Sequence, residues 1–295
     1  MRQMITCRDL RHSYGDKVVL DGLSFDIEQG GIFGLLGKNG AGKTTTINIL
    51  MGFLQPLSGE CRVLGLPSHG ISPEVRQNIG LLHEQFIQYD FMGINEIERF
   101  HSRFYPKWER DVFYDLVSRL DVPHDRRISR MSCGQRSQVV LGLIMAQKPA
   151  LMILDDYSMG LDVGYRRLFL DFLQEYVREQ GTTVLLTSHV VQDLDKIIDR
   201  MIIIQHGRVL VEGHKETFLE SFRQFRLPAS VPLDKLSVEG PVVALEQGRS
   251  SVSVFGYCVK TEMDSYLSSL GIPVQGLEEV FMDFEDAFIG ITGKY

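Results

Sequence analysis

The stretch that most constrains this chain is Gly37–Thr44, GKNGAGKT, which fits the pattern GxxxxGK[ST]. Its glycines let the backbone wrap around a polyphosphate with N–H groups pointing inward. An apolar run, GIFGLLG, precedes the pattern and a helix-like run follows it until Pro56. Lys43 would supply charge to the β- and γ-phosphates, and the Thr44 hydroxyl would be a Mg²⁺ ligand. The candidate cradle residues are Gly37, Asn39, Gly40, Ala41, Gly42, Lys43, Thr44 and Thr45.

Strands and helices alternate along most of the chain, which indicates an α/β fold on a mainly parallel sheet. The apolar runs LMILD and TTVLLTSH have the length and composition of buried strands. Near the N-terminus, ITCRDL and VVLDGLSFDIEQG alternate apolar and polar residues, as antiparallel strands with one exposed face do. Helical spacing fills most of residues 72–148. We therefore expect a helical subdomain, at about 85–150, inserted between two sheet strands.

The character of the chain changes after residue 222. FRLPASVPLDK contains two prolines and has no periodicity, so we interpret it as a linker. Two alternating segments and two helical ones follow, which predict a small α+β accessory domain. The expected division is 1–222 for the main domain and 223–295 for the accessory domain.

Two aspartates end the apolar run LMIL. In the second strand of a P-loop protein an acid at this point holds Mg²⁺, often through water, and we assign this role to Asp155. The next acid, Asp156, would lie near the γ-phosphate, where it can orient or deprotonate an attacking water. Because consecutive side chains on a strand point to opposite faces, the two carboxylates are expected to have different functions.

The segment MSCGQ, Met131–Gln135, ends twenty residues before Asp155 and resembles the LSGGQ signature of ABC-type ATPases. Ser132 would cap a helix, and Gly134 would permit close backbone approach. Other matches keep the order of the family over about residues 4–220. They are Tyr14 for the aromatic on adenine, Glu84 (or Gln85) for the Q-loop residue, Asp162 for the D-loop acid and His189 for the switch histidine.

The resemblance implies the roles of these residues. Two subunits would sandwich two ATP molecules, with Ser132, Gly134, Gln135 and Asp162 acting across the dimer. Asp156, His189 and Glu84 would be catalytic, and Thr44, Asp155 and Glu84 would hold Mg²⁺. The expected fold is a P-loop NTPase core of ABC type with N-terminal antiparallel strands, an inserted helical subdomain and a C-terminal α+β extension.

A single nucleotide-binding domain with a short C-terminal extension is similar to the ATP-binding subunits of bacterial ABC-2-type exporters. The stretch FYPKWERDVFYDLVSRLDV most resembles their YtrB-like subgroup. Such subunits pair with separately encoded membrane permeases, so the expected function is ATP hydrolysis that powers a permease, in a homodimer or beside a paralogous subunit. Most aromatic residues between Phe86 and Trp108 are expected in the core, and some in a groove that receives a permease helix.

Several positions depart from the family. Glu is usual at Asp156, Pro at Tyr157, Gly at Cys133 and Gln at Glu84. Asp is one methylene shorter than Glu, which draws the carboxylate back by ~1.3–1.5 Å, and a misplacement of about 1 Å can cost on the order of 10²-fold in rate. Three interpretations stay open. Asp156 still acts as the base, the site is slow beside a more active partner, or the chain is a mainly regulatory ATP switch.

Composition limits the alternatives. The net charge of −7 and scattered basic residues argue against a nucleic-acid partner, and no tandem cassette or coiled-coil insertion indicates a soluble ABC protein that acts on ribosomes. Four cysteines without a CxxC pair favour free thiols. MRQMITCRDL lacks the core of a signal peptide, and no apolar run approaches the ~20 residues of a membrane span. We therefore expect a cytoplasmic subunit, peripheral on the inner face of the plasma membrane through its permease.

Overall fold

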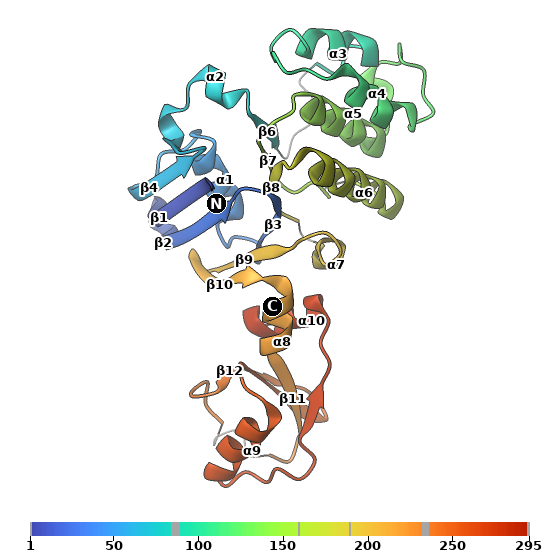
Figure 1. Ribbon diagram of the computed structural model, residues 1–295. Helices are drawn as coiled ribbons and strands as arrows, with labels where there is room; N and C mark the ends of the chain where they lie inside the picture. The colour runs from blue at the N-terminus through green and yellow to red at the C-terminus, as the bar shows by residue number, and fades with distance from the viewer. Residues whose placement is uncertain (1, 84–88, 159, 189, 232–235, 294–295) are drawn as a thin grey trace. The chain divides into compact units, whose positions relative to one another are not determined.

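The computed structural model describes residues 2–83, 89–158, 160–188, 190–231 and 236–293. The chain forms two compact units, Met1–Glu212 and Gly213–Tyr295. In Figure 1 the colour runs from blue through yellow along the first unit and on to red along the second. Over the described ranges, no helix combines the length and the hydropathy that crossing a membrane requires.

A six-stranded sheet forms the centre of the first unit, in the order β10-β9-β3-β8-β7-β6. The five strands from β9 to β6 pair in parallel, as predicted from the alternation of strands and helices. Every residue of β7 and β8 is buried, because helices cover both faces of the sheet. The strands are β3 (Gly31–Leu36), β6 (Ile79–Leu82), β7 (Leu151–Leu154), β8 (Thr183–Leu186), β9 (Arg200–Gln205) and β10 (Arg208–His214).

Three helices come directly after strands of this sheet. They are α1 (Lys43–Leu50) after β3, α6 (Val163–Gln180) after β7 and α7 (Val191–Leu194) after β8. The carboxyl ends of neighbouring parallel strands meet at one edge of a sheet, where open α/β folds bind ligands. The segments after β3, β7 and β8 are therefore brought together, although more than a hundred residues of chain separate the first from the second.

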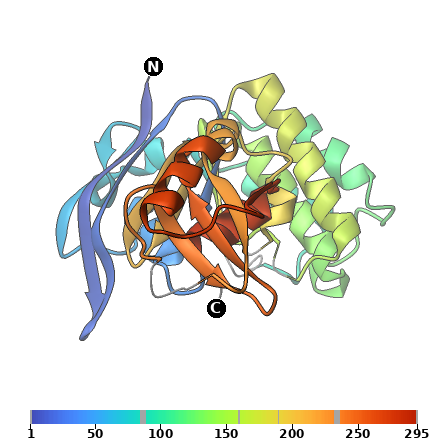
Figure 2. The same ribbon diagram turned by 90° about the horizontal axis from the view of Figure 1, so that it is seen from below.

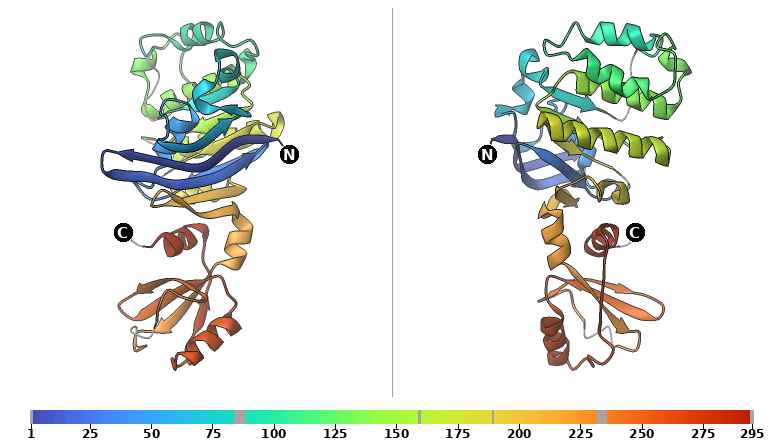
Figure 3. Two further views of the ribbon diagram at one scale, coloured as in Figure 1. Left: turned by 90° about the vertical axis from the view of Figure 1, so that its left-hand side faces the viewer. Right: turned by 45° about the vertical axis from the view of Figure 1, so that its right-hand side comes forward.

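A second, antiparallel sheet in the order β2-β1-β4-β5 carries the N-terminus. Its two long strands run side by side in the left view of Figure 3. Residues of its inner face, including Ile5, Leu10 and Phe25, pack in one core with α1. Cys7 and Cys61 are free thiols that face each other across β1 and β4, with Sγ atoms 3.9 Å apart. The elements are β1 (Gln3–Tyr14), β2 (Lys17–Glu28), β4 (Ser58–Val63), β5 (Leu66–Pro67), the 3-10 turn η1 (Ser68–Gly70) and α2 (Pro73–Arg76).

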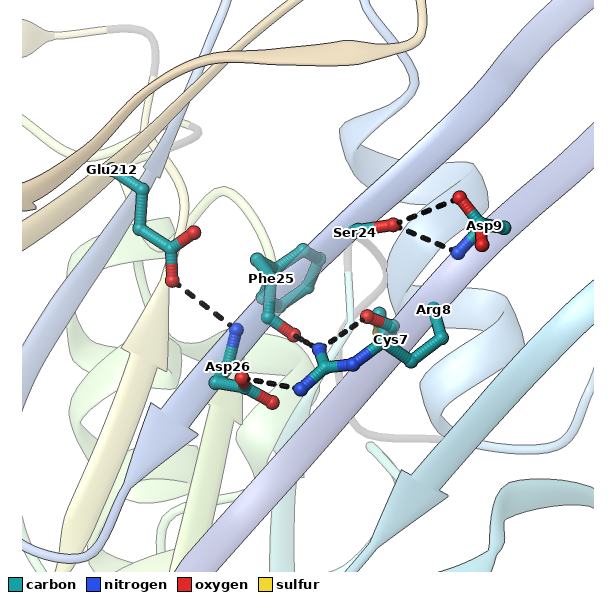
Figure 4. A network of polar contacts seen from close by, with 7 residues as sticks. All are labelled: Cys7, Arg8, Asp9, Ser24, Phe25, Asp26 and Glu212. Atoms are coloured by element: carbon teal, nitrogen blue, oxygen red, sulfur yellow. Dashed lines mark hydrogen bonds and ion pairs between the residues drawn. The ribbon is translucent and has the colours of Figure 1, made fainter.

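Polar contacts fasten β1 to β2 and β2 to the six-stranded sheet (Figure 4). The Arg8 guanidinium donates to the Phe25 carbonyl at 3.4 Å and to Asp26 Oδ2 at 2.6 Å. The Asp26 backbone N–H donates to Glu212 Oε1 of β10 at 3.2 Å. β1 ends at Tyr14, so these contacts hold the strand that carries the candidate adenine platform.

A helical subdomain is inserted between β6 and β7, as predicted. Its core contains Ile97 of α3, Phe113 of α4 and Val139 of α5, each 0% exposed. In Figure 2 these helices and α6 lie on the side of the first unit away from β1 and β2. The elements are α3 (Ile94–His101), α4 (Arg110–Ser118), the 3-10 turn η2 (Ile128–Arg130) and α5 (Cys133–Ala146).

The second unit is an antiparallel four-stranded sheet in the order β12-β13-β11-β14, with helices (Figure 3, right). Met263 and Leu267 of α9 pack on the sheet through Phe225 and its neighbours. The elements are α8 (Lys215–Ser221), β11 (Arg223–Pro228), β12 (Val242–Gln247), β13 (Ser251–Gly256), α9 (Lys260–Ser269), β14 (Glu278–Val280) and α10 (Phe284–Thr292). This arrangement is the predicted α+β class.

Two details of the predicted boundary differ from the structure. The start of the supposed linker, residues 225–228, is part of β11, where Phe225 and Leu227 are 0% exposed. The division of the units at 212/213 also precedes the predicted 222/223. The physical reason is α8, because Phe218 stacks on Phe222 at 5.2 Å and contacts Tyr257 of the second unit.

Candidate functional site

A pocket of about 440 Å³ opens where the P-loop, the end of β7 and the end of β8 meet. Many of the residues predicted to bind nucleotide line it. They are Tyr14, Asn39, Gly40, Gly42, Lys43, Thr44, Thr45, Asp155 and Asp156, joined by Lys17, Val19 and Thr187. Gly37 and Ala41 do not line it, because Ala41 packs in the core and Gly37 lies against β9.

Two glycines of the P-loop are required by close packing. A Cβ on Gly37 would lie 2.5 Å from the carbonyl oxygen of Ile204. Gly42 has a φ of 108°, in the left-handed region, and a Cβ there would lie 2.6 Å from Leu20 Cδ2. The loop therefore keeps its path between β9 and β2, so that α1 begins directly beneath the pocket.

Lys43 holds the loop from inside. Its ammonium donates to the carbonyls of Gly37, at 2.6 Å, and of Lys38, at 3.2 Å. Burial lowers the pKa of Lys43 below its usual range, and the negative charges of Asp155 and Asp156 partly oppose that shift. One cation and two carboxylates therefore interact across the pocket in which the sequence predicts a polyphosphate to bind.

Both carboxylates face the same pocket, contrary to the expectation from strand alternation. The reason is local, because β7 ends at Leu154 and Asp156 adopts a left-handed φ of 46°. Aspartate tolerates this conformation better than most residues do. The chain thus turns between the two acids, and alternation across a strand no longer applies to them.

Thr187, at the end of β8, connects the two acids. Its hydroxyl donates to Asp155 Oδ1 at 2.9 Å and accepts the backbone N–H of Asp156 at 2.8 Å. The Asp155 N–H donates to the Leu82 carbonyl of β6 at 2.8 Å, and Asp155 is 2% exposed. The first acid is therefore fixed by two neighbouring strands.

The oxygens of this pocket suit a Mg²⁺ ion. Thr44 and Asp155 offer a hydroxyl and a carboxylate, and Mg²⁺ typically takes one or two protein carboxylates together with substrate phosphates and water. Among the described residues, no group of three or more His, Cys, Asp or Glu side chains could hold a metal ion. An ion here would therefore depend on the bound phosphates.

The MSCGQ segment begins α5 with a capping box. The Ser132 hydroxyl accepts the Gln135 N–H at 3.2 Å, and Gln135 Oε1 accepts the Ser132 N–H at 3.1 Å. Gly134 has a packing role, because a Cβ there would lie 2.3 Å from Tyr165 Cδ2 of α6. Of the described residues that line the phosphate pocket, none belongs to this segment.

The remaining predicted residues lie at the edges of the site or beyond the described ranges. Tyr14 is 52% exposed at the pocket rim, and the His12 ring contacts it edge-on at 4.9 Å. Asp162 caps α6, with Oδ1 accepting the Tyr165 N–H at 3.0 Å. Glu84, Gln85 and His189 lie outside the described residues.

Sequence reasoning missed three hydroxyls behind the acids. They are Thr187 and Ser188 at the end of TVLLTS, and Ser158 within DDYS. A rule that inspects the residues directly after each buried parallel strand would have found the first two. Ser158 carries no such signal, because only the turn at Asp156 brings it back toward the carboxylate.

A second pocket, of about 410 Å³, lies between the sheet and the helical subdomain. Tyr89, Tyr105 and Phe53 are among its lining residues. The expectation that most aromatics of this region are core was wrong. Of those described, Tyr89, Phe91 and Phe104 are exposed and Phe100, Tyr105 and Trp108 are only partly buried. Aliphatic side chains fill the subdomain core instead.

Residues 20–158 match the family model described as ABC transporter. Nod factor export ATP-binding protein I of Sinorhizobium fredii (strain NBRC 101917 / NGR234) is 30% identical over 98% of this chain and 86% of its own length. The protein of the same name from Burkholderia orbicola (strain AU 1054) is 30% identical over 98% of this chain and 97% of its own length.

Solved structures share the fold of the first unit. The ATP-binding subunit of an ABC transporter has a TM-score of 0.66 at 23% identity and covers 74% of this chain and 92% of its own. The ATP-binding cassette MJ0796, in a dimeric post-hydrolysis state bound to ADP and Pi, has a TM-score of 0.61 at 19% identity. The match covers 72% of this chain and 98% of that cassette.

Proposed function

This chain belongs to the ABC transporter family of ATP-binding subunits, and from this premise we propose how its own residues hydrolyse ATP and what they drive. The chain is an ATPase subunit that powers a membrane transporter. The observation that carries the proposal is the pocket in which the P-loop, Asp155 and Asp156 meet. Export is the proposed direction, since the relatives are named for export.

In this proposal the P-loop N–H groups and Lys43 bind the β- and γ-phosphates, and Tyr14 stacks on the base. Thr44 and Asp155 would hold Mg²⁺, which offsets phosphate charge when bound. Asp156 accepts a proton from the water that attacks the γ-phosphorus. The new oxygen–phosphorus bond forms as the bond to the ADP oxygen breaks, and the proton goes to the Asp156 carboxylate.

Asp156→Asn and Asp156→Glu test the base. Asn keeps the shape but cannot accept the proton, so we expect kcat to fall by roughly 10²–10⁴-fold with the ATP dissociation constant unchanged. Glu keeps the carboxylate and is expected to retain or raise turnover. The exposed Asp16→Asn is the matched control. Wild-type turnover in Asp156→Asn would remove this residue from the chemistry, and no turnover in the unaltered chain, alone or with its permease, would favour a regulatory subunit.

A second nucleotide-binding subunit completes the proposed assembly. Ser132, Gly134 and Gln135 belong to a helix end outside the phosphate pocket of their own chain, which supports a role toward ATP held by another copy. The Asp156→Asn variant should therefore dimerise when ATP is added. Light scattering checks this, and a monomer at saturating ATP would point to a paralogous partner.

The second pocket supports a permease as partner. Its lining combines apolar residues such as Leu143 with aromatic rings, and Phe53 at its rim is 59% exposed. Amphipathic helices bind in grooves of this chemistry. We expect a cytoplasmic helix of the permease to dock here and hold the subunit at the membrane. We expect the permease to copurify with the wild-type chain and less well with Phe53→Ser. Val18→Ser, at an exposed residue that does not line this pocket, should retain copurification.

A further inference from the structure

One backbone amide and two serine hydroxyls form a chain of hydrogen bonds that ends at the Asp156 carboxylate. The Val190 N–H donates to Ser188 Oγ at 2.9 Å, Ser188 Oγ and Ser158 Oγ lie 3.1 Å apart, and Ser158 Oγ donates to Asp156 Oδ1 at 3.0 Å. Ser158 and Asp156 are each 8% exposed and Ser188 is 4% exposed. Of the three side chains, only Asp156 lines the nucleotide pocket, as far as the described residues show.

Counting protons fixes the direction of this chain. An ionised carboxylate only accepts, and each hydroxyl has a single hydrogen to donate. The Ser158 hydrogen is committed to Asp156, so Ser188 donates to Ser158 and uses a lone pair to accept from Val190. All three donors therefore point toward the carboxylate, and each hydrogen bond polarises the next.

The segment that carries Ser158 is held in place by its neighbour. Tyr157 is 2% exposed and stacks on Phe169 of α6, with ring centroids 5.1 Å apart. Since Tyr157 joins Asp156 to Ser158, its anchored ring limits movement of both. The Ser158 hydroxyl thus meets the carboxylate from a fixed point and not from a flexible loop.

From this arrangement we propose that Ser158 is a positioning residue for ATP hydrolysis and that Ser188 supports it. The inference rests on the proposed role of Asp156 as base. A charge-assisted hydrogen bond from Ser158 to one carboxylate oxygen fixes the rotation of the Asp156 side chain. This matters because Asp is shorter than Glu and its carboxylate has less freedom to adjust its position. Ser158 does not line the nucleotide pocket, so it is expected to act on the orientation of the base and not on ATP affinity.

The first test is Ser158→Ala with kcat and the ATP dissociation constant measured separately. Loss of the donor lets the carboxylate turn, and a displacement of about 1 Å costs on the order of 10²-fold in rate, so we expect kcat to fall by roughly 10- to 100-fold with ATP binding unchanged. Ser188→Ala should lower kcat by a smaller factor, since Ser158 still donates. Thr182→Val, which removes a buried hydroxyl that donates to the Pro149 carbonyl at 3.1 Å, is the matched control.

The second test repeats Ser158→Ala in the Asp156→Glu background. The longer side chain carries its carboxylate past the Ser158 hydroxyl, so the further loss should be less than about twofold if Ser158 acts by positioning. An equal loss of kcat in both backgrounds would show a merely structural role and overturn the inference. If Asp156→Glu fails to fold, the comparison of Ser158→Ala with Thr182→Val decides alone, and equal kcat in those two variants overturns it.

The two proposals fail in different ways. Wild-type turnover in Asp156→Asn would refute the role of Asp156 as base, and with it the positioning role of Ser158. Loss of turnover in Asp156→Asn combined with wild-type kcat in Ser158→Ala leaves the base intact and refutes only the positioning role.

Discussion

Gly134→Ala tests whether the glycine of the MSCGQ segment serves helix packing. A Cβ at this position would lie 2.3 Å from Tyr165 Cδ2 and 2.5 Å from Cγ, whereas real Cβ contacts stay above 3.0 Å. The obstacle is a ring that packs against the helical core, so α5 and α6 must separate. Overpacking of this kind costs about 1–3 kcal/mol. For a unit of this size, a cost of about 2 kcal/mol lowers the melting temperature by about 4–8 °C.

A double variant makes the reasoning falsifiable. Tyr165→Leu removes the ring, so Gly134→Ala should cost much less in that background than in the wild type. Gly70→Ala is the control, because a Cβ there meets nothing within 4 Å. Calorimetry measures the wild type, the two single variants, the double variant and Gly70→Ala. A melting temperature of Gly134→Ala equal to that of the wild type, or strict additivity in the double variant, would refute the packing explanation.

ATP turnover in the same proteins separates packing from ligand approach. If Gly134 is needed only to leave space for the Tyr165 ring, the double variant should regain ATP hydrolysis together with stability. If the backbone at Gly134 must also approach ATP on a second subunit, stability returns while turnover stays low. Either result identifies the role of Gly134, because the two roles predict different ATP turnover in the double variant.

Two further predictions concern hydrogen bonds elsewhere. Thr187→Val removes both contacts to the acid pair and should cost about 1–3 kcal/mol of unfolding free energy, with weaker Mg²⁺-dependent ATP binding by titration calorimetry. Hydrogen bonding from Arg208 lowers the pKa of the partly buried Asp21 carboxyl below its ordinary 3.8, so this contact stabilises the fold above pH 4 and is lost as the carboxyl protonates. Arg208→Ala should raise the midpoint of Asp21 in an NMR titration, and an unmoved midpoint contradicts the assignment.

Much of the architecture could be predicted because its signals are local. Glycines of a P-loop, apolar runs that end in acids and helical spacing each act within about ten residues, and the sheet then brings the loop ends together. The turn between the adjacent strands β9 and β10 is also local, because His206 and Gly207 adopt left-handed φ values of 50° and 72°.

The failures arise where tertiary contacts decide. FRLPAS has the composition of a linker, yet the alternating Phe225 and Leu227 are buried by α9 and the neighbouring strands. The aromatics between residues 86 and 108 have helical spacing, yet Tyr89 and Tyr105 line the second pocket and the other described ones are exposed or only partly buried. A periodic pattern shows that one face is apolar, but it cannot show whether that face meets the core or a partner.

The departures around the acids are best understood together. Tyr157 stacks on Phe169 of α6, and Cys133 lies so close to Gly160 that a Cβ there would be 2.8 Å from its Sγ. Tyr157 is therefore packed against α6, and Gly160 lies against the start of α5. A shorter side chain tolerates less displacement than a longer one, because its carboxylate extends less far toward the attacking water. If Asp156 is the base, as proposed, then the stacking of Tyr157 on Phe169 and the hydrogen bond from Ser158 both reduce that displacement, and the rate of hydrolysis is expected to depend on these two contacts.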